Sequence, residues 1–233
     1  KLAFNKVLSR EAMIRVAALD LLASELSGAL FLVERCKEGD FPLQTANASI
    51  HEKLRAHGDP SINNYLSKLL KNNDSKITDA QEREILRIRA IVSAGGGNPK
   101  NGENTFTRLC IGCHKMFDRG GEVGPDLTSY QRNDKDALLM SLVAPGAEIR
   151  EGYENVIIKT KSHTVHSGFL VEDTAKYIAI RELSGATRVF ERNKIKSLTS
   201  TGVSLMPQGL LHGIDDATLK DFFAYLRSTT PPF

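Results

Sequence analysis

Apolar residues in the first part of the chain follow the spacing of amphipathic helices. Between Val7 and Leu26 they recur three or four residues apart, which predicts a helix with a wide buried face. Breaks near residues 39–42 and 58–60 contain glycine and proline and divide the segment into shorter elements. Short antiparallel helices in this rhythm are typical of HEAT-type repeats, with a plain helical bundle as the alternative. We therefore expect residues 1–94 to form a helical, HEAT-like region.

A capping pattern and a linker mark the end of this region. Asp79 is placed to cap a helix that runs to Ser93, and Glu82 follows three residues later, as in a capping box. The run Gly95-Gly96-Gly97-Asn98-Pro99 then combines residues that favour turns and end helices. This run is the clearest linker in the chain, and it predicts a domain boundary.

The second half of the chain begins and ends with helical patterns. Residues 101–109 and 134–143 are amphipathic and predict helices, and residues 120–127 form a glycine-rich loop between them. Residues 215–227 predict a final helix. Its expected inner face carries four apolar residues, Leu219, Phe222, Phe223 and Leu226.

Residues 150–200 change to the alternating, β-branched pattern of strands. Turn residues separate five stretches of this kind. The stretches are residues 153–160, 164–171, 177–182, 188–191 and 195–198. Five short strands at this spacing predict a small antiparallel barrel or meander.

Composition and charge narrow the possible functions. A length of 233 residues suggests two or three modules, and the hydrophobic content of 41% is enough for them to have cores. The formal net charge is only +3, so nothing indicates a nucleic-acid partner. No apolar run approaches the ~18 residues of a membrane span, so no transmembrane segment is expected. The chain begins at Lys1 without a signal peptide, which favours a processed or excised piece.

The strongest chemical signal is the run Cys110-Ile111-Gly112-Cys113-His114. This C-x-x-C-H pattern is the attachment site of c-type haem, because two thiols at this spacing can bond to the vinyl groups of one porphyrin. The histidine that follows can then serve as an axial ligand of the iron. Zinc sites and redox disulfides also use C-x-x-C, but no second ligand pair follows and a βαβ context is missing. We expect one covalent haem c, held by Cys110, Cys113 and His114.

The order of these elements resembles a class I cytochrome c. A leading helix, C-x-x-C-H, the Gly124-Pro125 loop, a middle helix, a Met-Pro pair at Met206 and a final aromatic helix follow one another as in that class. Residues 79–233 resemble more closely a haem-binding domain family of planctomycete and verrucomicrobial proteins. In that family a cytochrome c domain follows helical repeats or a sugar-dehydrogenase-like propeller. It also has a β-rich insertion before a Ser-Leu-Met-Pro segment, which stands here at residues 204–207.

The resemblance completes the expected fold, which is mainly α with a small β insertion. It implies a cytochrome c domain formed by residues 98–149 and 201–233. A five-stranded antiparallel module at residues 150–200 would interrupt this domain before the methionine loop. The helical region 1–94 would precede it, although the first 78 residues match the family only loosely.

The resemblance also implies roles for two further residues. Met206 would be the second axial ligand, since a thioether is a soft, neutral ligand that favours Fe(II). Its alternative is a buried core methionine. Pro125 resembles the family proline whose carbonyl accepts the other ring N–H of the axial histidine, which would fix the orientation of His114. The alternative for Pro125 is an ordinary turn proline.

An iron with two protein ligands has no open position, so the expected activity is single-electron transfer rather than catalysis. The expected partner is a redox protein or a larger dehydrogenase domain, and the expected compartment is periplasmic or otherwise extracytoplasmic. One alternative is a haem enzyme or a gas or redox sensor with a displaceable sixth ligand, for which Arg150, Arg181 and His166 could converge. Another is an interaction module in which the haem is structural. The sequence leaves the oligomeric state open.

Overall fold

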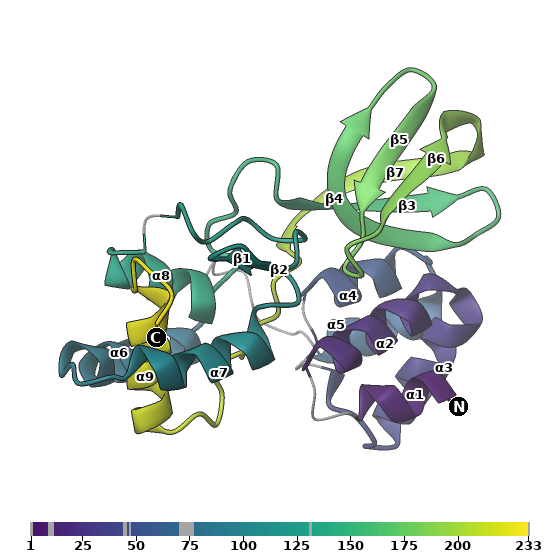
Figure 1. Cartoon of the computed structure of the whole chain (residues 1–233). Coiled ribbons are helices and arrows are strands. Elements are labelled where there is room, and N and C mark those ends of the chain that lie inside the picture. Colours follow the sequence, from purple (N-terminus) through teal and green to yellow (C-terminus); the bar gives the residue numbers. More distant parts are fainter. Residues whose placement is uncertain are drawn as a thin grey trace. The chain divides into compact units, whose positions relative to one another are not determined.

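The computed structural model contains helices and antiparallel sheets (Figure 1). It describes residues 2–8, 12–43, 46, 48–69, 77–130 and 132–232. These residues form nine helices, a five-stranded sheet and a two-stranded sheet. The predicted combination of helices with a five-stranded antiparallel module is confirmed.

The chain divides by its contacts into two compact units. The first comprises residues 1–73 and 149–207, and the second comprises residues 74–148 and 208–233. The strands of the five-stranded sheet therefore group with the N-terminal helices. This division differs from the predicted one, in which the β module stood alone.

Five helices form the N-terminal part of the first unit. They are α1 (Leu2–Val7), α2 (Ala12–Ser24), α3 (Leu26–Lys37), α4 (Ala48–Arg55) and α5 (Pro60–Leu69). The predicted breaks are present, because Gly39 and Gly58 adopt positive φ angles of 87° and 76° just after α3 and α4. Leucine and isoleucine side chains from these helices fill one apolar core. The contacts of α2 with α3 and α4 suit both the repeat and the bundle interpretation.

The five-stranded sheet follows the predicted strands closely. It consists of β3 (Glu154–Thr160), β4 (Val165–Asp173), β5 (Tyr177–Arg181), β6 (Thr187–Glu191) and β7 (Ile195–Ser204). The strands lie in the antiparallel order β6-β5-β4-β3-β7, so the last strand returns to pair with the first. β7 continues past the predicted end at Leu198, because residues up to Ser204 pair with β3. Residues 201–204 thus belong to the sheet rather than to the predicted cytochrome domain.

A buried ion pair joins two helices of the first unit, and hydrogen bonds beside it join these helices to the sheet. Lys53 on α4 is 1% exposed, and its Nζ donates to Oδ1 of Asp20 on α2 over 2.7 Å. The hydroxyl of Ser167 on β4 donates to the same carboxylate. Lys159 on β3 donates to the carbonyl oxygens of Ala56 and His57, just beyond the end of α4. These polar contacts fix the sheet on the helices at defined positions.

Four helices and a short hairpin form the second unit. They are α6 (Asp79–Ser93), α7 (Pro99–Leu109), β1 (Lys115–Met116), β2 (Arg119–Gly120), α8 (Lys135–Val143) and α9 (Asp216–Leu226). Helices α7 and α9 approach closely at Gly102, where any Cβ atom would overlap with the backbone of Asp221. The ring of Phe106 packs against that of Tyr225 at 5.3 Å between centroids. The four apolar residues predicted to face inward on the last helix are all buried.

Two expectations about α6 need correction. Its N-cap is Thr78, whose side chain accepts from the backbone of Gln81 while the Gln81 side chain accepts from Thr78 N–H. The capping box is therefore shifted by one residue from the predicted pair Asp79 and Glu82. In addition, α6 contacts α8 and α9 and belongs to the second unit. A boundary at residue 94 does not match these contacts.

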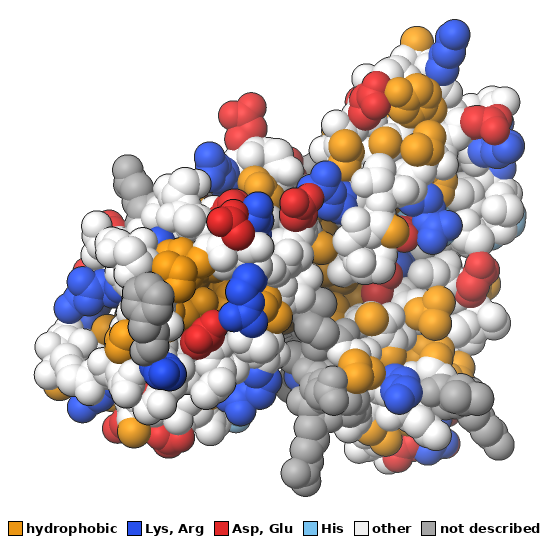
Figure 2. All heavy atoms as spheres, in the orientation of Figure 1, with side chains coloured by type: hydrophobic (Ala, Val, Ile, Leu, Met, Phe, Trp, Pro, Cys, Tyr) orange, Lys and Arg blue, Asp and Glu red, His pale blue; other side chains and the backbone are white. Residues whose placement is uncertain are grey.

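The surface carries both signs of charge. On the face shown in Figure 2, basic and acidic side chains are interspersed, as the small net charge implies. None of the helices in the described ranges has the length and apolar content needed to span a bilayer.

The buried ion pair gives a stability prediction. Lys53→Ala leaves the Asp20 carboxylate without its cation, and we expect the free energy of unfolding to fall by roughly 3 kcal/mol. Lys37→Ala is the matched control, because it removes an exposed pair with Glu34 and should cost less than about 1 kcal/mol. Urea unfolding followed by circular dichroism measures both losses. Equal losses would contradict a structural role for the buried pair.

Candidate functional site

The C-x-x-C-H run forms a compact turn at the end of α7. The backbone N–H of Cys110 continues the helix by donating to the carbonyl of Phe106 over 2.8 Å. The N–H groups of Cys113 and His114 then both donate to the carbonyl of Cys110, over 3.0 Å and 2.9 Å. The chain therefore reverses within a few residues, and the two thiols and the imidazole belong to one rigid turn.

The glycine-rich loop predicted at residues 120–127 lies directly on this turn. The N–H of Gly121 donates to the carbonyl of Ile111 over 2.8 Å, and that of Gly124 donates to the carbonyl of Cys113 over 2.7 Å. Gly120 has a φ of 121°, and a Cβ atom there would overlap with the carbonyl of His114. Glycine is needed here because only a residue without a side chain permits this approach.

The imidazole of His114 is held from two sides. Its Nδ1 lies 2.9 Å from the carbonyl oxygen of Pro125, the contact that the resemblance implied. A carbonyl can only accept, so Nδ1 carries the hydrogen and Nε2 of the neutral ring keeps its lone pair. Gly124 lies against the ring, where a Cβ atom would overlap with it. These contacts fix the tautomer and the orientation of the ring.

Burial favours the neutral form of all three side chains. It lowers the pKa of His114, an effect that the hydrogen bond to Pro125 partly opposes. It also raises the pKa of Cys110 to about 12, with a smaller contribution from Cys113. The pKa of Cys113 is raised by burial as well. Reactive redox cysteines have lowered pKa values, whereas the thiol pKa values in this turn are raised.

The second predicted axial ligand, Met206, is far from this turn in the sequence. Met206 is half-buried just after β7, and its backbone N–H donates to the hydroxyl of Ser204 over 3.1 Å. By its contacts it belongs to the first unit, whereas Cys110, Cys113, His114 and Pro125 belong to the second. The structure thus brings four of the five predicted site residues together in one unit.

The donor set of the turn has the side chains that a haem attachment site needs. Within the described part of the chain, no three or more His, Cys, Asp and Glu side chains come together to hold a metal ion. Haem iron needs fewer protein ligands, because the porphyrin supplies four of them. The turn offers two thiols at the attachment spacing and one imidazole with its lone pair on Nε2. Cys110, Cys113 and His114 would therefore hold a haem.

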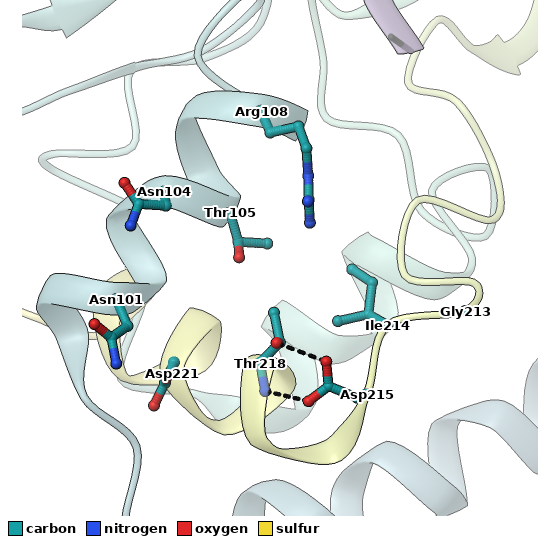
Figure 3. A pocket seen from close by; sticks show the side chains of 9 residues that line it. All are labelled: Asn101, Asn104, Thr105, Arg108, Gly213, Ile214, Asp215, Thr218 and Asp221. Carbon is teal, nitrogen blue, oxygen red and sulfur yellow. Dashed lines mark hydrogen bonds between the residues drawn. The ribbon is translucent and has the colours of Figure 1, made fainter. Parts of the chain in front are cut away.

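A polar pocket between α7 and the start of α9 is separate from this turn (Figure 3). Asn101, Asn104 and Arg108 lie on its α7 side. On its other side, Asp215 caps α9 by accepting from the N–H and the hydroxyl of Thr218. The lining includes no cysteine, histidine or methionine, so the pocket contains none of the predicted site residues.

His166, a candidate for peroxide or sensor chemistry, has both ring nitrogens engaged within the β module. Its Nδ1 lies 3.1 Å from Oε1 of Glu182, and its Nε2 lies 3.1 Å from the hydroxyl of Thr164. Glu182 also accepts from Arg188 over 2.8 Å. The imidazole therefore serves an internal polar cluster of the sheet.

Sequence reasoning missed one residue near the turn. Arg132 is 7% exposed, and its guanidinium donates to the carbonyls of Thr128, Leu226 and Ser228. An arginine after a glycine-rich loop looks like an ordinary surface residue in the sequence. Only the proximity of α9 shows that it is buried.

Comparison with known proteins adds no family to these observations. The chain matches no protein-family model and no curated protein. The function is therefore argued from the turn itself.

The contact of Gly124 with the imidazole gives a second prediction. Gly124→Ala places a methyl group where the His114 ring lies, so the ring or the loop must move. We expect a loss of about 1–3 kcal/mol in the free energy of unfolding, the usual range for overpacking, and a changed NMR environment for the ring. Gly146→Ala is the control, because nothing lies within 4 Å of a Cβ atom there. A Gly124→Ala protein indistinguishable from the control would contradict the contact.

Proposed function

We propose that this chain is a c-type cytochrome module that holds one covalent haem and transfers single electrons. Cys110 and Cys113 would carry the thioether bonds, and His114 and Met206 would be the axial ligands of the iron. The segments after residue 98, apart from the β module, would form the cytochrome c fold. The observation that carries the proposal is the His114 ring, whose Nδ1–H is bound to Pro125 while Nε2 keeps a lone pair.

The neutral state of the turn supports this assignment. Axial ligation needs an unprotonated imidazole nitrogen, and burial lowers the pKa of His114. Thioether formation adds each thiol S–H across a vinyl double bond, so the sulfur and its hydrogen both remain in the product. Once the thioether has formed, its sulfur no longer ionises, so the raised pKa values of the thiols have no further effect. The turn suits a fixed anchor better than a reactive thiol pair.

Electron transfer follows from the ligand set. A bound haem supplies an iron that alternates between Fe(III) and Fe(II). The Pro125 carbonyl polarises and orients His114, and Gly124 keeps the ring from turning. A rigid ligand reduces the rearrangement that accompanies a change of charge. Met206, a neutral sulfur ligand, would favour the reduced state.

The proposal includes a cellular context. Covalent haem attachment places the protein in the periplasm or another compartment outside the cytoplasm. A redox protein or a dehydrogenase domain would exchange electrons with it. The first unit, with its helices and sheet, would serve as scaffold or docking part for that partner.

The test of haem attachment is expression with a c-type haem maturation apparatus in the periplasm. We expect a coloured protein whose haem stays on the chain in a denaturing gel, since two covalent bonds hold it. The double variant Cys110→Ala/Cys113→Ala should lose the haem under the same conditions. Cys36→Ala is the matched control, because Cys36 is a buried thiol of the first unit. A colourless wild-type protein, or haem released on denaturation, would overturn the proposal.

The test of the axial pair is the spin state of the iron. The wild type should be six-coordinate and low-spin, and its ferrous form should not bind carbon monoxide. Met206→Ala should become high-spin and bind carbon monoxide, whereas Met140→Ala, which alters a half-buried methionine of α8, should behave as wild type. A wild type that binds carbon monoxide readily would favour the haem enzyme or sensor instead.

A further inference from the structure

Arg132 occupies an unusual place for a charged side chain. It lies after the loop that follows His114, and it is 7% exposed. Nη1 donates to the carbonyls of Leu226 and Ser228, each over 2.8 Å, and Nη2 donates to the carbonyl of Thr128 over 3.0 Å. The guanidinium also lies over the ring of Phe117, 5.4 Å from its centroid. It thereby joins the loop after His114 to the C-terminal end of α9.

The positive charge of Arg132 has no acidic partner in contact. Every acceptor named above is a neutral carbonyl. Among the described residues, the exposed carboxylate of Asp126 acts on the guanidinium electrostatically, without a direct ion pair. Its Nε is buried and has no hydrogen-bond partner among the residues that the structure describes. Arginine stays protonated even when buried, so the second unit contains an internal cation that no direct ion pair neutralises. Burying such a charge costs free energy, which calls for a gain elsewhere.

This cation lies close to the His114 turn. Nη1 is 3.9 Å from the sulfur of Met116, and two backbone steps from Met116 to His114 span at most about 7 Å. Thr128, which accepts from Nη2, lies three residues after Pro125, whose carbonyl holds the His114 ring. Both ends of the loop that orients His114 are therefore tied to the guanidinium.

We propose that Arg132 raises the reduction potential of a haem held at His114, because its buried charge disfavours Fe(III). The inference rests on the proposed function and adds a residue that controls it. Oxidation adds one positive charge at the iron, and an internal cation opposes that change. At an effective dielectric constant of about 20, two unit charges roughly 12 Å apart interact strongly enough to shift an equilibrium about tenfold. For a one-electron couple, a tenfold shift is about 59 mV.

The experiment measures the midpoint potential of the haem-loaded protein by spectroelectrochemistry. Arg132→Gln and Arg132→Met remove the charge, the first keeping hydrogen-bond donors and the second keeping apolar volume. Arg132→Lys keeps the charge but not the guanidinium geometry. Arg89→Gln is the control, because it makes the same change in net charge at an exposed arginine paired with Asp136. The free energy of unfolding of each variant is measured in parallel.

We expect both neutral variants to lower the potential by about 59 mV, with Arg132→Lys near wild type and a much smaller shift for Arg89→Gln. Neutral variants whose potential shifts no more than that of Arg89→Gln would overturn the inference. An Arg132→Lys protein whose potential is lowered as much as that of the neutral variants would overturn it too. If only Arg132→Lys still matured with haem, Arg132 would be a structural clamp, and the inference would again fail. A wild type without covalent haem would overturn the proposed function itself. If the wild type carries a low-spin haem but the neutral Arg132 variants have the same potential, this inference alone is overturned.

Discussion

The hydrogen bond from Nδ1 of His114 to the carbonyl of Pro125 is the constraint on which the second unit depends. It decides which ring nitrogen keeps its lone pair, and so decides what the imidazole can bind. The backbone around it is arranged to permit this bond. Gly121 and Gly124 donate to carbonyls of the C-x-x-C-H turn, and Gly124 has no Cβ atom that would displace the ring. A loop with side chains at these positions could not lie so close.

Two buried cations show how differently the two units use charge. Lys53 contacts the carboxylate of Asp20 and joins α4 to α2, which is a structural use of a compensated pair. Arg132 contacts carbonyls and an aromatic ring, and Asp126 acts on it without a direct ion pair, so its charge is less fully balanced than that of Lys53. A compensated pair has little field beyond its own contact, whereas an isolated charge in a poorly polarisable interior acts over a longer distance. This difference is why we propose a redox role for Arg132 and a structural role for Lys53.

The grouping of the β module with the N-terminal helices changes how the chain is understood. Although the module is inserted between two segments of the second unit, Lys159 and Ser167 contact residues of the first 60 positions. Its strands therefore belong to the first unit and not to the second. The proposed cytochrome part then consists of the remaining segments together with α6, whose contacts are with α8 and α9. The chain crosses between the two units more than once.

The sequence by itself determined what depends on neighbouring residues. Strand alternation located the five strands, and the apolar face of α9 was identified from its spacing, because each signal lies within a few positions. The C-x-x-C-H run is equally local, and it predicts the haem chemistry that we propose. Only the tertiary structure decided that residues 201–204 extend β7, that α6 joins the second unit and that Arg132 is buried beneath the end of α9. The contact of Arg132 with Leu226 joins residues far apart in the chain, and local patterns carry no information about such a pairing. Burial and charge compensation are properties of the assembled interior, so they become visible only after the chain has folded.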